Sequence, residues 1–269
     1  MSRGLWRPAT SGGGGGSWTE RFNVLRDFNS GTVGNAANGT ADGFTSDAGR
    51  SLYDTTHVYE GAKSCKCTIL TTDSESNGGN GGPGQWGGII ETPSDAVKGD
   101  DVWAEANIFF PAGFVITTPG NGSLKTIRLR TLTAGNANAG FLDLQHRDDS
   151  EPGSFRFIKE ATEEDWLYFG PDGLVTRDSW HRLTLCAHLD NVAADNGGTG
   201  RVRVWYDGAN VLDSGARRTL TNATDKLNAL YLFTHWNGDV PQNQSCWIDA
   251  LRIAAGTGTP SWASDLEGV

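Results

Sequence analysis

The chain has 269 residues, among them 37 glycines, ten tryptophans and eleven phenylalanines, and 20% of its residues are charged. Glycine is at about twice its usual share of ~7%, a turn-rich composition that is not typical of a helical bundle. No apolar run approaches the ~18 residues of a membrane-spanning helix, and recurring strand-sized apolar blocks argue against intrinsic disorder. The formal net charge of −10 disfavours a protein that mainly neutralises nucleic-acid phosphate.

Residues 1–17 include the run Gly12 to Gly16 and predict a flexible tail. They lack the apolar stretch of a secretory signal. We therefore expect either that a leader has been removed or that the protein is released by lysis, as a virus-associated protein would be. Residues 18–269 show no repeat and no internal linker, which predicts one domain.

Seven segments after the tail are rich in β-formers or alternate between apolar and polar residues. They are Val102–Phe110, Leu124–Thr131, Gly140–His146, Trp180–Leu189, Arg201–Tyr206, Ala229–His235 and Cys246–Ile253. Clusters of Gly, Asn, Asp and Pro separate them, and no amphipathic helix intervenes. This pattern predicts an all-β, jelly-roll β-sandwich of the concanavalin A-like lectin/glucanase type, with two antiparallel sheets.

The four cysteines are too few and too scattered for a disulfide framework, and no C-x-x-C pair suggests zinc. They are Cys65, Cys67, Cys186 and Cys246. Buried free thiols are the simplest interpretation, and a bridge from Cys246 to Cys67 or Cys186 is the alternative.

The histidines are dispersed, and we expect no cofactor and no catalytic metal. A structural calcium ion near Asp100–Asp101 or Asp148–Asp149 remains open, although solvated turn residues are the default for such pairs.

Positive charge is concentrated in residues 121–147, which hold four basic residues and one acid, a net +3 that leaves −13 for the rest of the chain. Strand alternation puts Arg128 and Arg130 on one face and Lys125 on the other. Such an Arg-x-Arg triplet suits a bound carboxylate, because guanidinium offers a planar fork. The alternative is a solvated sheet face with cross-strand ion pairs to Asp143.

Further polar side chains lie on neighbouring predicted strands. Gln145 and His146 end one strand, and Lys159 ends the segment Phe155–Lys159. Tyr231 and His235 share alternation along another strand. Removal of the proton next to a uronate carboxylate first requires that the carboxylate be neutralised. It also requires a base and an acid, and Tyr and His can fill both roles without a metal.

The segment Tyr231–Ile253, YLFTHWNGDVPQNQSCWIDALRI, resembles the end of the jelly roll of polysaccharide lyases of the glucuronan lyase, heparinase-like and alginate lyase types. There a Tyr-bearing strand runs into a "WNG…P…Q" loop and a final "hIDDIRh" strand. His57–Leu70 resembles their early "G-x-K-S" strand, and Asp100–Phe114 with Gly122–Thr131 resembles the middle. The resemblance covers roughly residues 50–254.

This resemblance implies β-elimination of a polymer containing uronic acid, such as alginate or glucuronan. The acidic polysaccharide is then the expected partner, with no nucleic acid or membrane. Arg128, Arg130 and Gln145 would hold the carboxylate, while His146 and Tyr231 transfer protons. The expected substrate-binding residues are Lys125, Lys159, His235, Trp236, Asn237 and Gln242. Gln145 and His146 are adjacent, so they point to opposite faces unless a bulge intervenes.

Two other functions stay open. A glycoside hydrolase needs two carboxylates ~5–9 Å apart, for which Glu91 and Glu105 are candidates. A non-catalytic carbohydrate-binding or virion-associated module would stack sugars on Trp86, Trp205, Trp236 or Trp247, although tryptophans also fill sandwich cores. Burial of His146 away from Tyr231 would favour the binding module.

Overall fold

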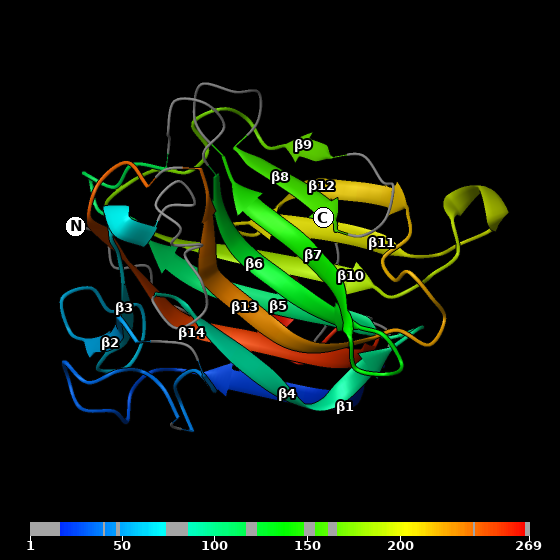
Figure 1. Cartoon of the computed structure of the whole chain (residues 1–269), viewed down its shortest axis with the longest axis horizontal. Helices are drawn as coiled ribbons and strands as arrows, with labels where there is room; N and C mark the ends of the chain where they lie inside the picture. The colour runs from blue at the N-terminus through cyan, green and yellow to red at the C-terminus, as the bar shows by residue number, and fades with distance from the viewer. Residues whose placement is uncertain are drawn as a thin grey trace.

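The computed structural model describes residues 17–39, 41–46, 49–73, 86–116, 123–147, 154–160, 166–238 and 240–266. Within these residues the chain forms two packed antiparallel sheets, with the strands of one lying across those of the other (Figure 1). The predicted jelly-roll sandwich is therefore confirmed. Residues 1–16 of the expected tail lie outside the described residues.

The larger sheet has the strand order β12-β11-β10-β5-β14-β3-β2, and β1 pairs with β14 beside it. Its strands are β1 (Thr19–Arg26), β2 (Ser51–Asp54), β3 (Ser64–Ile69), β5 (Asp101–Phe109), β10 (Trp180–His188), β11 (Arg201–Tyr206), β12 (Ala209–Ala216) and β14 (Gln244–Thr257).

The smaller sheet has the order β4-β13-β6-β7-β8-β9. Its strands are β4 (Gly88–Val97), β6 (Ser123–Leu132), β7 (Asn138–His146), β8 (Phe155–Lys159), β9 (Leu167–Phe169) and β13 (Lys226–Asn237). The short 3-10 helices are η1 (Thr71–Asp73), η3 (Ala194–Asn196) and η4 (Ser261–Leu266). No helix in the described part of the chain is long and apolar enough to cross a membrane.

Alternate residues of the facing strands form the core. On β6, Leu124, Ile127 and Leu129 are fully buried and pack into the main apolar cluster, to which β10 contributes Leu183 and Leu185. A second, smaller cluster lies against β5, β10 and β11, where Trp103 stacks on Trp205 and Trp262 of η4 meets Trp103 edge-on. Each face of the larger sheet thus carries its own apolar packing.

Two irregularities decide which side chains leave the core. The β6 pairings with β7 and with β13 both shift register at Thr126. On β13 the shift falls between Leu232 and His235, where Phe233 has a φ of 50°. Gly87 fits beside this bulge because it has no side chain: a Cβ there would lie 2.1 Å from the Leu232 carbonyl oxygen.

Trp236 follows this bulge and lies in the core, fully buried in the main apolar cluster. The sequence-based expectation that it binds substrate is therefore wrong, because its indole is enclosed between the sheets. Trp86 is fully buried in the same cluster. Neither tryptophan offers a surface on which a sugar ring can stack.

All four cysteines are buried and free, as the simplest interpretation held. Cys67 and Cys246 lie directly opposite each other on β3 and β14. Of the expected calcium positions, Asp100 pairs with Arg21 at 2.6 Å and Asp101 contacts His188 at 2.8 Å. Asp148–Asp149 lies outside the described residues.

We predict that Trp236→Ala lowers the free energy of unfolding by about 3–5 kcal/mol, because it leaves a cavity in a closely packed core. Urea unfolding followed by circular dichroism measures this loss. Val33→Ala is the control, since Val33 is half-exposed and should change stability by less than about 0.5 kcal/mol. An unfolding free energy unchanged by Trp236→Ala would contradict the core assignment.

Candidate functional site

Polar side chains gather on the face of the smaller sheet that points away from the core. Residues directly opposite on antiparallel strands project to the same face. His235, Lys125, Gln145 and Arg156 form one such row across β13, β6, β7 and β8. A second row contains Tyr231, Arg128, Asp143 and Ile158, and a third contains Ala229, Arg130 and Phe141. We call these three rows the polar face.

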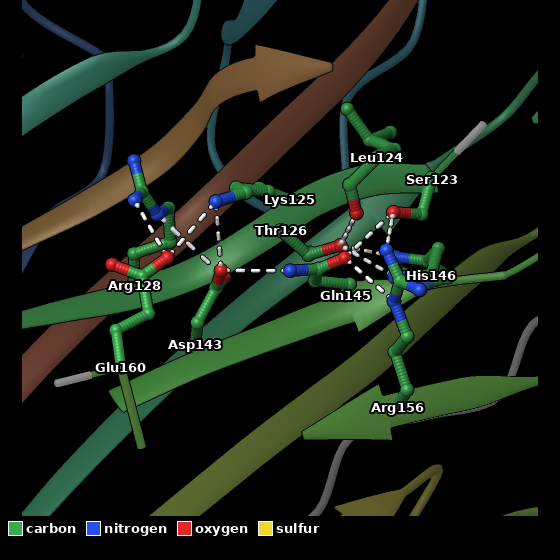
Figure 2. Close-up of polar contacts among 10 residues, drawn as sticks. All are labelled: Ser123, Leu124, Lys125, Thr126, Arg128, Asp143, Gln145, His146, Arg156 and Glu160. Carbon is green, nitrogen blue, oxygen red and sulfur yellow. Dashed lines mark hydrogen bonds and ion pairs between the residues drawn. The ribbon is translucent and has the colours of Figure 1, made fainter. Parts of the chain in front are cut away.

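Asp143 is the fully buried centre of the polar face (Figure 2). Its Oδ2 lies 3.1 Å from Lys125 Nζ, and its Oδ1 lies 3.6 Å from Arg128 Nε. Glu160, which directly follows β8, contacts the same two cations, at 3.0 Å from Lys125 Nζ and 3.3 Å from Arg128 Nη2. Two carboxylates therefore share two cations, and Glu160 is the more exposed of the two.

The two carboxyl groups are held differently. Burial raises the pKa of Asp143, against the opposing effect of Lys125 and Arg128. Burial also acts to raise the pKa of Glu160, but the two cations outweigh it and lower that pKa below its ordinary value. Glu160 is thus the carboxylate that keeps its negative charge most readily beside Lys125 and Arg128.

Gln145 links Asp143 to the next cation along its row (Figure 2). Its Nε2 donates to Asp143 Oδ2 at 2.7 Å, and its Oε1 accepts from Ser123 Oγ at 2.6 Å and from Arg156 Nε at 2.8 Å. Arg156 also donates from Nη2 to Ser123 Oγ at 2.6 Å, and its guanidinium lies over the ring of Trp166. These contacts fix the orientation of the amide.

Tyr231 lies beside a guanidinium on the polar face. Arg130 Nη1 donates to the Tyr231 hydroxyl at 2.9 Å, and Arg130 Nε donates to Asn228 Oδ1 at 2.9 Å. The phenol ring packs edge-on against Phe141, over which the Arg128 guanidinium lies at 3.8 Å from the ring centroid. This arrangement holds the Tyr231 hydroxyl next to a cationic side chain on the polar face.

His146 lies on the opposite side of its strand from Gln145. Its ring is buried in the core against Phe110 and Phe155, and its Nδ1 contacts the Thr126 hydroxyl. Burial lowers its pKa to about 3. The structure does not place His146 on the polar face with Tyr231, so we do not retain it as a proton-transfer group.

Lys159 also points away from the polar face. It is fully buried, and its Nζ donates to the carbonyl oxygens of Ala139 at 3.2 Å and Glu160 at 3.0 Å. Burial lowers its pKa to about 8. The expectation that Lys159 binds substrate is therefore wrong, because its ammonium group is buried and donates to backbone carbonyl oxygens inside the sandwich.

The face predicted for Lys125 is wrong, whereas substrate binding by Asn237 and Gln242 stays a prediction. Simple alternation assigned Lys125 to the face opposite Arg128, but the bulge at Thr126 brings both to Glu160. Gln242 lies in the loop after β13, where its Nε2 donates to the Gly113 carbonyl oxygen at 2.7 Å. The side chain of Asn237 lies outside the described residues.

The sequence analysis missed three polar residues of this network: Ser123, Glu160 and Asn228. Each stands at a strand end or next to a register shift, where no alternation pattern assigns a face. Their positions follow from which residues they pair with on neighbouring strands, and these pairs are known only once the order of the strands in the sheet is known. Among the described residues, no group of His, Cys, Asp and Glu could hold a metal ion.

The carboxylate pair considered for a glycoside hydrolase is divided between the sheets. Glu91 lies opposite Ala229 on the smaller sheet. Glu105 belongs to β5 of the larger sheet, where it accepts from Arg182 Nε at 2.6 Å and from Thr184 Oγ1 at 3.0 Å. The two do not flank one groove, so this pair does not support a hydrolase.

No family model and no curated protein matches the sequence. Solved structures resemble the fold. A variant of alginate lyase Aly36B in complex with alginate trisaccharide has a TM-score of 0.59 at 16% identity, covering 86% of this chain and 97% of the other. Alginate lyase vAL-1 from Chlorella virus has a TM-score of 0.54 at 11% identity, covering 83% and 99%. The fold is thus the jelly roll that these lyases share.

We predict that the unfolding free energy of His146→Phe falls less steeply than that of the wild type as the pH is lowered. The native ring stays neutral down to about pH 3, whereas the unfolded chain takes up a proton near pH 6.5. The histidine therefore contributes fully above pH 6.5, and its contribution falls by at most about 1.4 kcal/mol per pH unit below that.

Urea unfolding of both proteins at pH 7.5, 6 and 5 measures this difference. The unfolding free energy of the wild type should fall more steeply with acid than that of His146→Phe. His188→Gln serves as the control. Asp101 raises the pKa of His188, so this histidine stabilises the fold at low pH and its loss should make the unfolding free energy fall more steeply with acid. Equal slopes for the wild type and His146→Phe would show that the ring is not held neutral.

Proposed function

We propose that the protein is a polysaccharide lyase that cleaves a polymer containing uronic acid by β-elimination. The observation that carries the proposal is the contact of Arg130 with the Tyr231 hydroxyl at 2.9 Å, next to Arg128 and Lys125 on the same face. A proton-transfer group and cations for a carboxylate stand together there, on a fold that alginate lyases share.

The proposed reaction begins by neutralising the uronate carboxylate, which makes the neighbouring C–H bond more acidic. Lys125 and Arg128 are suited to this because each already holds the Glu160 carboxylate, at 3.0 and 3.3 Å. Glu160 thus occupies a position that a uronate carboxylate could take. Arg156 would extend the binding surface along the same row, whereas Gln145 is fully buried and orients Arg156 rather than holding the uronate carboxylate itself.

Tyr231 is the proposed proton-transfer group. Its oxygen, held by Arg130, acts as the base and accepts the proton beside the uronate carboxylate. The electron pair of that C–H bond forms the new C=C bond as the bond to the glycosidic oxygen breaks. The glycosidic oxygen then takes that proton from Tyr231, which returns the side chain to its starting state. His235 lies on the same face opposite Lys125 and is the second candidate for proton transfer.

A non-catalytic carbohydrate-binding module is the second candidate. The burial of His146 on the core side favours it, because one of the two expected proton-transfer groups is absent from the polar face. The same cations would then hold an acidic polymer without cleaving it. The two functions differ in whether a double bond forms.

We predict that ultraviolet absorbance rises when the protein is incubated with at least one polymer of a panel of alginate, glucuronan, heparin-type and pectic polymers. Elimination leaves a conjugated double bond that absorbs in this range. Tyr231→Phe should abolish the rise while keeping the fold. Tyr59→Phe is the matched control, since Tyr59 is exposed and contacts Trp180 of the larger sheet.

Full activity of Tyr231→Phe would remove Tyr231 from the mechanism. No absorbance change with any polymer, together with retardation of the protein in a gel containing one of them, would instead support the binding module.

We also predict that Glu160→Gln lowers KM for the cleaved polymer several-fold without raising kcat, because the neutral side chain no longer competes for Lys125 and Arg128. Steady-state kinetics by ultraviolet absorbance separates the two constants. Glu20→Gln, at an exposed position of β1 on the larger sheet, is the control. A KM that rises in Glu160→Gln would mean that Glu160 helps to bind substrate.

A further inference from the structure

A serine, a histidine and an aspartate form a hydrogen-bonded chain at the start of β10, on the larger sheet. Ser179 Oγ lies 2.8 Å from His181 Nε2, and His181 Nδ1 lies 2.7 Å from Asp207 Oδ2. Both imidazole nitrogens are thus engaged, one by a hydroxyl and the other by a carboxylate. This order of contacts is that of a serine nucleophile, its general base and the group that orients the base.

The surroundings hold the imidazole and the carboxylate in place. Asp207 Oδ1 accepts from the Arg182 backbone N–H at 2.8 Å, and the Asp207 N–H donates to the Arg182 carbonyl oxygen at 2.8 Å. The His181 ring stacks on Tyr206, with 5.0 Å between ring centroids and 20° between planes. An aspartate fixed in this way selects the tautomer with hydrogen on Nδ1, which leaves Nε2 to accept the serine proton.

Turns with left-handed residues flank this hydrogen-bonded group on both sides. Asp178, which precedes Ser179, has a φ of 58°, and Asp207 has a φ of 50°. Asp207 and Gly208 form the two-residue hairpin turn between β11 and β12, a turn type in which a left-handed aspartate is common. The Asp178 carboxylate accepts from the Ala112 N–H at 2.7 Å, which helps to hold the turn that presents Ser179.

A second hydroxyl, that of Thr176, contacts the same imidazole nitrogen and allows the two hydroxyls to be compared. Thr176 Oγ1 lies 2.8 Å from the same His181 Nε2 and 3.1 Å from Ser179 Oγ. Thr176 is exposed and Asp207 is about half-exposed, so solvent reaches the chain of contacts. The more crowded secondary alcohol of threonine is the weaker nucleophile of the two hydroxyls.

We infer that Ser179, His181 and Asp207 form a second catalytic site, which hydrolyses small carboxylic esters independently of the polar face. The Ser179 hydroxyl passes its proton to His181 Nε2 as its oxygen bonds to the ester carbonyl carbon. His181 returns the proton to the leaving alcohol as the C–O bond breaks. Water, deprotonated by His181, then releases the acid from the acyl-serine and restores the hydroxyl.

Labelling with a fluorophosphonate tests the nucleophile in the full chain. We expect one adduct, located on Ser179 by peptide mass spectrometry, with loss of fluoride. Ser179→Ala should abolish the adduct, whereas Thr176→Val should keep it. An adduct on Thr176, or no adduct in the wild type, would overturn the assignment.

Hydrolysis of p-nitrophenyl acetate tests the base and its orientation. General-base assistance accelerates such reactions by about 10²–10⁴-fold, so His181→Gln should lose acceleration of this order. Asp207→Asn should also slow the reaction and alter its pH profile, because the tautomer of His181 is no longer fixed. Circular dichroism of each variant reports whether the fold is kept.

The polar face provides the last control. Tyr231→Phe should hydrolyse the ester at the wild-type rate, and Ser179→Ala should keep its action on, or retention by, acidic polymers. Ester hydrolysis that survives in Ser179→Ala, or that is lost in Tyr231→Phe, would contradict a separate site. Failure of this site would leave the proposed lyase function untouched.

Discussion

The burial of the Asp143 carboxylate is the constraint that organises the polar face. A charge removed from water costs several kcal/mol unless it is paired and hydrogen-bonded. Asp143 is fully enclosed, and Lys125, Arg128 and Gln145 each supply a contact to it. Loss of any one of these partners would leave a buried charge less compensated, so their positions are tied together. The geometry of the cations is therefore set by a residue that offers no surface to a ligand.

The sandwich itself could be predicted because its evidence is local. Arg201–Tyr206 was predicted with the bounds that β11 has, and Val102–Phe110 differs from β5 by one residue at each end. When one face of a strand is buried, apolar and polar residues alternate along it, and this order can be read directly from the sequence. The edge strand β12, none of whose residues is fully buried, carries no such signal.

The site was predictable only in part, because bulges reset the alternation. The extra residue at Thr126 moves Lys125 to the face of Arg128. The adjacency of Gln145 and His146 was enough to predict that they point to opposite faces. Which of the two lies in the core depends on the packing of the second sheet, which no single strand reveals. Ser179, His181 and Asp207 meet through the pairing of β10 with β11, a long-range contact absent from the sequence pattern.

The pairing of Lys125 and Arg128 with Asp143 and Glu160 also has a consequence for how the protein meets its partners. Because these cations are largely neutralised by their own neighbours, the chain's formal charge of −10 dominates its electric field at a distance. If the partner is the proposed acidic polymer, this field repels it in dilute buffer before it reaches the sheet. Dissolved ions shorten that repulsion to about 8 Å at 0.15 M. Moderate ionic strength should therefore speed the association of such a polymer, and only higher salt concentrations should weaken its binding.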